Sequence, residues 1–529
     1  MGRSEVPLSV QPVSQTEIEG LMSEMRFTDA RLGKAPANAM KEAMTWPLLQ
    51  QEANRFKYFC WIDQAHTVML CETGIIKIEP ARLLLRALRE LESEGVATLQ
   101  LDPQFGSYLF QVERWLAKRI GEDAAGRMHT ARGRADYGSA SLALAARSTI
   151  VELYHWVIEL QRGIVELAKS HTKTLMPGYT HLQHAQPTTF GHYILSHYYP
   201  LKRDLERLQG LYARTNVSTL GSCSRVGTNW PIDRYRVAEL LGHDSLVMNA
   251  QDQCYYRRDH LSEYAAVTSI MAHNLARLAT DIDIWHSEEF DMFELPAEYC
   301  GSSSIMPQKR NPEPLERCRA VAGESIGWMP AALGIFKLPH TSVADPSYSV
   351  VSEGRLFDDV SMSLSSMVRL CAEALPKTVI KKDRMDALAR GRWNIASRLG
   401  DIIAQETGMP FGDSHVIVGG LVRHCIDNGI PPSKVTSAIL DEVALRAVGR
   451  PLGFEEELVA NAMDAMEFVN ALKGPGSANP DVVREAAAEA ESQIEDDMAW
   501  LIGARSKEQA ARNKLNDAID AILSEARSS

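Results

Sequence analysis

Two long stretches without proline constrain the fold of this chain more than any other feature. No proline occurs between Pro103 and Pro177, or between Pro231 and Pro296. Proline breaks helices, so both stretches are free to form long uninterrupted ones. Apolar residues recur in them every three to four positions, as on the buried face of a helix. The first apolar stripe comprises Ile150, Leu153, Tyr154, Val157, Ile158, Ile164, Val165 and Leu167. The second comprises Leu261, Tyr264, Ala265, Thr268, Met271, Ala272, Leu275, Leu278 and Ile282.

These stripes predict an all-α fold built around a long central helical bundle. Strand-like alternation between turn signals is almost absent from the sequence. A stripe of this length belongs either to the core of a monomer or to a bundle shared between subunits, and long parallel helices favour the shared bundle. Breaks in the pattern predict an N-terminal helical domain (1–102), a central bundle domain (103–376) and a C-terminal helical domain (377–529).

Charge and composition argue against several kinds of partner. The formal net charge is −12 and the sequence pI is about 5.7, which disfavours nonspecific binding to nucleic acid or to an anionic membrane. No segment has the apolar length of a secretion signal or a membrane-spanning helix, so we expect a cytoplasmic protein. The 8 cysteines are scattered without CxxC pairs or a histidine-containing ligand pattern, so we expect reduced thiols and no metal site.

The run GSSSIMPQKRNPEPLE at 301–316 fits neither the helical nor the strand period. Glycine and serines make such a segment adaptable and expose hydroxyl groups and backbone amides. Lys309 and Asn311 are placed to face an anionic ligand together. The run therefore indicates a functional loop that acts on a carboxylate; the alternative is a solvated surface turn with incidental serines.

Three further clusters carry polar groups suited to binding or catalysis. Residues 127–137 read RMHTARGRADY, and arginines at a helix start are well placed to hold a carboxylate or phosphate. Residues 178–187 read GYTHLQHAQP and form a predicted loop, although a lone histidine is more often structural than catalytic. Residues 227–234 read GTNWPIDR, where Asp233 is best explained as a helix cap.

Together these clusters resemble the fumarase and aspartase superfamily, whose hallmark is a GSSxMPxKxN loop. Residues 303–311 match it, with Ser302 in the place of the glycine. Within that superfamily the chain is most similar to the argininosuccinate lyase branch. The similarity rests on MPQK in the loop, HTAR at 129–132, GYTHLQHAQP, LGS…GTNWPIDR at 220–234 and MPFGDSHVIVGGLV at 409–422, and it extends from about Lys57 into the 420s.

The resemblance implies a carbon–nitrogen lyase that eliminates an amine from an N-substituted aspartate and releases fumarate through an aci-carboxylate carbanion. By matching, Ser303 is the general base that removes the Cβ proton, and Lys309 and Asn311 hold the carboxylate whose charge grows in the transition state. His181 matches a histidine that the family pairs with a carboxylate, and Glu316 stands at the place of that carboxylate. This dyad orients the substrate or supplies a proton to the leaving amine.

The same resemblance implies the binding residues and the assembly. Arg134 and Thr180 match the carboxylate-binding arginine and threonine of the family, and Gln183 belongs to the same cluster as Thr180. Arg258, in RRDH, matches an arginine that positions substrate. The family forms homotetramers in which each active site draws residues from three chains, so we expect activity to require the tetramer. No cofactor is expected.

The chain departs from the branch at the segments that recognise the amine. The usual HTGRSRNDQ is HTARGRADY here, so Gly133 and Ala135 replace a serine and an asparagine. The usual YNKDLQED is replaced by HTSVADPSYSVVSE at 340–353. We interpret Tyr137 and Tyr348, with Glu313 in place of an aspartate, as the lining of an altered amine pocket.

These departures leave the substrate open. Argininosuccinate or a similar N-substituted aspartate is the first candidate. The alternative is another aminocarboxylate, such as ethylenediamine-N,N′-disuccinate (EDDS) or a related chelator. For such a substrate, either direction of the reaction stays open, including C–N bond formation. A noncatalytic crystallin-like protein is a further alternative, which the intact catalytic residues disfavour.

Overall fold

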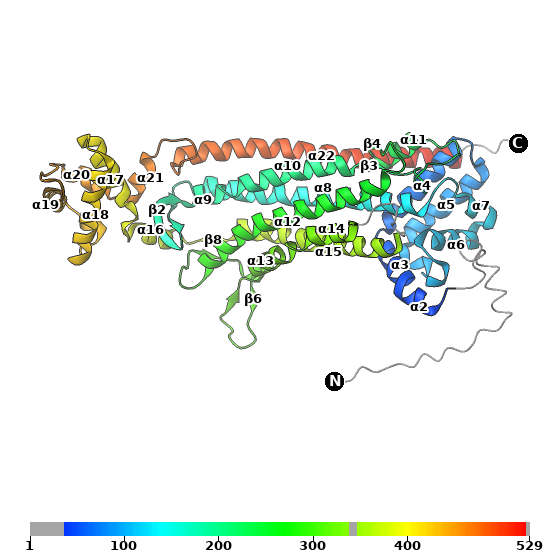
Figure 1. Cartoon of the computed structure of the whole chain (residues 1–529), viewed down its shortest axis with the longest axis horizontal. Coiled ribbons are helices and arrows are strands. Elements are labelled where there is room, and N and C mark those ends of the chain that lie inside the picture. Colours follow the sequence, from blue (N-terminus) through cyan, green and yellow to red (C-terminus); the bar gives the residue numbers. More distant parts are fainter. Residues whose placement is uncertain (1–35, 338–345, 525–529) are drawn as a thin grey trace.

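The computed structural model describes residues 36–337 and 346–524, without the side chains of 254, 255, 257 and 346–351. Its centre is a bundle of long helices that lie side by side (Figure 1). These are α8 (Arg134–Ser170), α10 (Tyr198–Thr215), α12 (Gln253–His286), α15 (Pro346–Ala374) and α22 (Pro480–Ser524). Helix α8 contacts α10, α15 and α22, and α12 packs against α10 and α15. The prediction of a mostly helical fold is confirmed.

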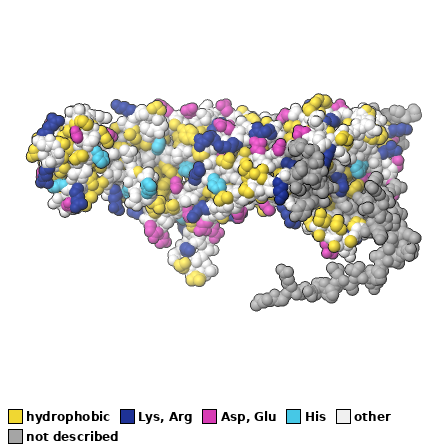
Figure 2. Space-filling model, in the orientation of Figure 1, with side chains coloured by type: hydrophobic (Ala, Val, Ile, Leu, Met, Phe, Trp, Pro, Cys, Tyr) yellow, Lys and Arg dark blue, Asp and Glu magenta, His cyan; other side chains and the backbone are white. Residues whose placement is uncertain are grey.

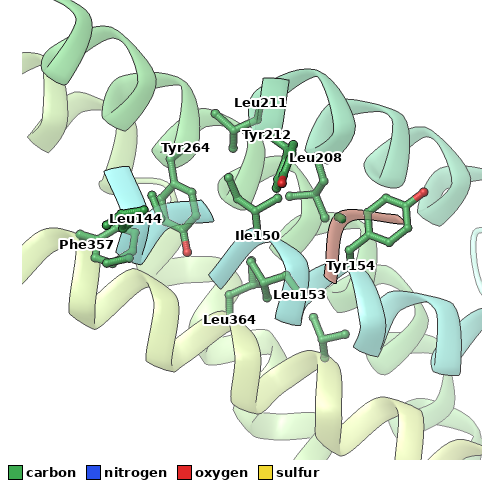
Figure 3. Close-up of a cluster of buried hydrophobic side chains, with 14 of the residues drawn as sticks. Leu144, Ile150, Leu153, Tyr154, Leu208, Leu211, Tyr212, Tyr264, Phe357 and Leu364 are labelled. Atoms are coloured by element: carbon green, nitrogen blue, oxygen red, sulfur yellow. The ribbon is translucent and has the colours of Figure 1, made fainter. Parts of the chain in front are cut away.

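Both predicted apolar stripes are buried in this bundle. Figure 3 shows Ile150 and Leu153 of α8 between Leu208 and Leu211 of α10 and Leu364 of α15. Burial of one such side chain stabilises the fold by about 1.5–3 kcal/mol, so the stripes account for much of the stability of the bundle. No proline interrupts α8 or α12, as the sequence predicts.

Helices at one end of the bundle come from the N-terminal part of the chain. They are α2 (Asn38–Met40), α3 (Trp46–Ala53), α4 (Phe56–Glu72), α5 (Ile78–Glu94), α6 (Tyr108–Ile120) and α7 (Glu122–Arg127), with a π-helical turn at Lys41–Thr45. Their buried side chains belong to the same continuous core as those of the bundle. Helix α22 ends beside them and contacts α4 and α5 (Figure 1).

A second core lies at the opposite end of the molecule (Figure 1). Its helices are α16 (Lys382–Arg390), α17 (Ala396–Thr407), α18 (Phe411–Asp427), α19 (Ser437–Val448), α20 (Glu456–Ala462) and α21 (Ala465–Ala471). Helix α22 starts at this end and runs back along the bundle, with 45 residues or about 68 Å of helix. The exact division into three domains stays a prediction.

Within the described residues, short helices and four two-stranded sheets connect these parts. The helices are α9 (Phe190–Leu195), α11 (Arg234–Leu241), α13 (Glu313–Ser325) and α14 (Trp328–Phe336). The antiparallel pairs are β1 (Leu175–Thr180) with β2 (Gln183–Thr189), β5 (Phe293–Glu294) with β8 (Val379–Ile380), and β6 (Gly301–Ser302) with β7 (Arg310–Asn311). Strands β3 (Val217–Ser218) and β4 (Ser245–Leu246) are parallel.

The described residues contain neither a candidate membrane-spanning helix nor a candidate metal-binding cluster. None of their helices combines the length and the apolarity that a membrane span needs. Nor do histidine, cysteine and acidic side chains gather anywhere in those residues as a group able to hold a metal ion.

Candidate active site

The serine loop, residues 303–309, joins the two strands of the β6–β7 hairpin. Backbone N–H groups of Ile305 and Met306 both donate to the Ser303 hydroxyl oxygen, at 3.3 and 3.0 Å. Two donors aimed at one oxygen stabilise negative charge on it, as a serine base requires. Figure 2 shows the loop standing out from this face with hydrophobic side chains at its tip, where Ile305 is 87% exposed.

The base of the serine loop is fixed by ion pairing and by close packing. Arg310 donates to Glu294 at 2.6 Å. The carboxylate of Glu313 lies over Gly301, so that a Cβ on Gly301 would meet Glu313 Oε1 at 1.7 Å. Asn311 pairs with Gly301 across the hairpin. The lysine of the loop, Lys309, is exposed in the single chain.

Thr180, His181 and Gln183 lie at the tip of the β1–β2 hairpin, not on the irregular loop that the sequence predicts. Thr180 pairs with Gln183, and the two-residue turn between them consists of His181 and Leu182. Both turn residues have positive φ, 55° and 57°, as in a type I′ turn, which normally takes Asn-Gly. Side chains with a Cβ are strained there, and such strain gathers at functional sites.

Aromatic packing supports this hairpin from below. The Tyr179 ring stacks edge-on against His184 at 5.2 Å and lies 5.9 Å from Trp285 of α12. Burial, with the nearby Arg392, lowers the pKa of His184. The strands also approach closely, since a Cβ on Gly178 would lie 2.6 Å from the carbonyl oxygen of Gln186. The exposed tip is therefore held on a rigid base.

Arg134 is the first residue of α8, where a helix N-terminus and a guanidinium group together favour an anion. The buried Asp136 carboxylate accepts the N–H groups of Gly133 at 2.9 Å and of Gly221 and Cys223 at 3.0 Å each. Burial raises the pKa of Asp136 to about 6, and these backbone hydrogen bonds oppose the rise. Asp136 thereby ties the start of α8 to the turn at 219–223.

The same turn brings Arg258 to this end of the bundle. Gln253, in the first turn of α12, donates to the carbonyl oxygen of Cys223 at 3.2 Å, and Arg258 lies five residues further along α12. Asp233 accepts the N–H of Arg236 at 2.9 Å and caps α11, so the interpretation of Asp233 as a helix cap is confirmed.

The interpretation of Tyr137 as an amine-pocket residue is wrong. Tyr137 is only 2% exposed. Its ring lies 4.4 Å from that of Phe59, and its hydroxyl donates to Asp63 at 3.0 Å. The helical phase of α8 points this side chain into the core, which the match to a motif does not reveal. The side chain of the other proposed pocket residue, Tyr348, lies outside the described part of the structure. The same holds for most side chains of the segment 340–353.

One chain does not bring the matched residues together. Helix α8 contains 37 residues and is therefore about 55 Å long. Arg134 is its first residue, whereas Thr180 and His181 follow its far end. In the described part of the chain, His181 and Glu316 form no ion pair with each other, and both are exposed. Within the described part of one chain, the matched residues therefore do not form a complete site.

Sequence reasoning missed two features of the site. The first is the strained hairpin, since its His-Leu turn carries no turn signal. The second is Asp63 on α4, which is buried and bound to the cluster at 127–137. A signal for Asp63 existed, because a carboxylate within the apolar run FKYFCWIDQAHTVML must find a buried partner.

Comparison with known proteins places the chain in a class of lyases. The family described as "Lyase" matches residues 45–327, and that described as "Argininosuccinate lyase C-terminal" matches 394–470. The chain is 38% identical to the argininosuccinate lyase of Methanothermobacter thermautotrophicus, over 82% of this chain and 92% of that protein. It is 36% identical to that of Methanocaldococcus jannaschii, over 80% and 85%. The chain therefore belongs to the argininosuccinate lyase family of the fumarase and aspartase superfamily, and it is a lyase, as the resemblance predicts.

Solved structures agree on the fold and widen the range of substrates among relatives. EDDS lyase in complex with formate superposes with a TM-score of 0.80 at 29% identity, over 93% of this chain and 96% of that one. An EDDS lyase variant with bound fumarate gives 0.79 at the same identity. The 3-carboxy-cis,cis-muconate lactonizing enzyme of Pseudomonas putida, 18% identical with a TM-score of 0.66, shares the fold.

Proposed function

We propose that the protein eliminates an amine from an N-substituted aspartate and releases fumarate. The Ser303 oxygen takes the proton from Cβ, and the electron pair moves into the adjacent carboxylate to give the aci-carboxylate. That pair then forms the C=C bond as the Cα–N bond breaks, and the amine leaves with a proton. The observation that carries the proposal is the pair of backbone N–H groups held on Ser303 Oγ.

The other side chains have roles that follow from their charge. Lys309 and Asn311 stabilise the carboxylate that gains charge, because a dianion needs preorganised positive potential. Arg134 and Thr180 bind the second carboxylate, and Arg258 and Gln183 help to position the substrate. His181, oriented by Glu316, protonates the leaving amine. These steps require no cofactor.

The complete site forms, in this proposal, in a homotetramer from three chains. The length of α8 supports it, because Arg134 and His181 of one chain lie at or beyond opposite ends of this helix. The exposure of Lys309, His181 and Glu316 supports it too. Polar groups that chemistry needs in a water-excluded cavity are open to solvent in the single chain.

Argininosuccinate is the first substrate to test, because two relatives named argininosuccinate lyase are 38% and 36% identical to this chain. EDDS is the second candidate, since the match to EDDS lyase covers 93% of this chain. Gly133 and Ala135 replace the serine and asparagine of the branch, so two side-chain hydrogen-bonding groups are missing beside Arg134. This loss in a segment that recognises the amine favours an amine other than that of argininosuccinate, and so the second candidate.

Ultraviolet detection of fumarate tests the proposal directly. Purified protein is supplied in turn with argininosuccinate, EDDS, adenylosuccinate and aspartate, and the first or second should release fumarate. Ser303→Ala should lower kcat by at least about 100-fold, the usual contribution of a general base. Ser302→Ala is the matched control, because Ser302 is the neighbouring serine on β6, and it should keep most activity. Equal losses in both variants, or no fumarate from any of the four compounds, would contradict the proposal.

A further inference from the structure

The buried carboxylate of Asp63 links helix α4 to the cluster at 127–137. Asp63 belongs to α4, and its side chain and that of Arg132 are each 1% exposed. One carboxylate oxygen accepts Arg132 Nη1 at 2.6 Å, and the other accepts the Tyr137 hydroxyl at 3.0 Å. Each of its oxygens therefore holds a different residue of the cluster at 127–137.

These two residues enclose Arg134 in the sequence. Arg132 precedes it by two positions and Tyr137 follows it by three. The Arg132 guanidinium also lies 4.6 Å from the centre of the Tyr137 ring, so the two clamping side chains contact each other. We call Asp63, Arg132 and Tyr137 the clamp. Two residues before Arg132, the carbonyl oxygen of Thr130 contacts His66 of α4 at 2.9 Å. The segment that presents Arg134 is thus fixed at both ends by one helix.

The free energy of burying charge explains why the Asp63 carboxylate is an effective support for Arg132 and Tyr137. Burial raises the pKa of Asp63 above its ordinary value, and the charge and hydrogen bond of Arg132 oppose this rise. Hydrogen bonds to a charged acceptor are stronger than neutral ones, and low dielectric surroundings strengthen them further. Removal of the carboxylate would also leave Arg132 as an unpaired buried charge. The clamp is therefore stiff, and a stiff support is what a substrate-binding arginine needs.

Resting on the proposed function, we infer that Asp63 is a positioning residue of the lyase, which holds Arg134 in register with the substrate carboxylate through Arg132 and Tyr137. Asp63 itself does not touch substrate, since both of its oxygens are engaged in the core. Its contribution appears in substrate binding and alignment more than in stability alone. A displacement of about 1 Å in such a contact is enough to reduce turnover up to 100-fold.

Tyr137→Phe tests this inference with a matched control on the same helix. Tyr154, also on α8, donates a 3.0 Å hydrogen bond to another buried carboxylate, Asp497. The two tyrosines are about 25 Å apart along the helix. Tyr137→Phe and Tyr154→Phe each remove one hydroxyl from a tyrosine–aspartate pair, and only the first lies beside Arg134. Asp63→Asn is the stronger variant, and Tyr137→Phe decides the question if Asp63→Asn does not fold.

We expect Tyr137→Phe to raise KM about tenfold while Tyr154→Phe leaves it unchanged. Tyr154→Phe should lower Tm at least as much, because the Tyr154 hydroxyl also accepts a hydrogen bond from Gln209 at 2.6 Å. Hydrogen exchange should become faster at amides 133–137 in Tyr137→Phe alone. Equal KM values in the two variants would overturn the positioning role, as would unchanged exchange at those amides. If wild type releases no fumarate from any substrate, the proposed function fails, and the exchange comparison still decides whether Asp63 holds this segment.

Discussion

Two inactive variants, when mixed, should restore activity if each site is built from different chains. Ser303 lies on the β6–β7 hairpin and His181 at the tip of the β1–β2 hairpin. The proposed function gives both a chemical role, so Ser303→Ala and His181→Ala should each be nearly inactive as pure homomers. In the proposed tetramer, a site takes Ser303 from one subunit and His181 from another.

The expected recovery follows from random assembly. In an equal mixture, each of the two positions in a site is wild type with a probability of one half. About one quarter of the sites then contain both wild-type residues, if subunits assort freely in a symmetric oligomer. The mixture should therefore regain about 25% of wild-type specific activity, a value far above the background of either variant.

The assay is fumarate release after the two variants are unfolded together, refolded and separated by size. Ser303→Ala mixed with Lys309→Ala is the control. One loop carries both residues, so every loop in this mixture lacks either the wild-type serine or the wild-type lysine. That mixture should stay inactive. Recovery in the control, or a Ser303/His181 mixture that assembles fully yet stays at background, would refute the assignment of these residues to different chains.

Three further predictions concern the supports of the site and the core. Gly178→Ala places a Cβ 2.6 Å from the Gln186 carbonyl oxygen, so kcat/KM should fall by about tenfold or more as the hairpin tip shifts; unchanged kinetics would mean that the tip tolerates movement. Burial lowers the pKa of His197 to about 4, below the 6.5 of an exposed histidine. Its neutral form therefore stabilises the fold above pH 6.5, and up to about 3 kcal/mol is lost as the pH falls from 6.5 towards 4. In urea titrations at pH 7 and pH 4.5, His197→Gln should lose less stability on acidification than wild type, and equal losses would contradict this. Cys318 and Cys371 are buried with their sulfurs 3.4 Å apart, and their hydrogen bond and burial raise the pKa of Cys318. A thiol reagent should therefore label the partly exposed Cys300 before the buried Cys318, as peptide mass mapping would detect, and labelling of both at the same rate would contradict the buried placement.

The long helices were predictable because their cause is local. A period of three to four residues in the apolar positions sets which face is buried, whatever that face packs against. Ile150 and Leu278, chosen from the sequence on this ground, are both in the core. The β1–β2 hairpin was not predictable in the same way. Its turn is His181-Leu182, and only the surrounding tertiary structure compensates for two non-glycine residues at positive φ.

Motif matching located the candidate site residues but not their directions. Arg134 and Tyr137 belong to one eleven-residue motif, yet Arg134 is exposed at the helix start while Tyr137 points into the core. The phase of α8 turns Tyr137 inward, and a hydrogen bond to Asp63 holds it there; Asp63 lies 74 residues earlier, in a helix that carries no motif. A sequence motif therefore predicts which groups are available, whereas their orientation depends on buried partners from distant segments. For this chain, Tyr137 does not line the amine pocket, and specificity should instead depend on partly exposed positions such as Ala135 and Arg258.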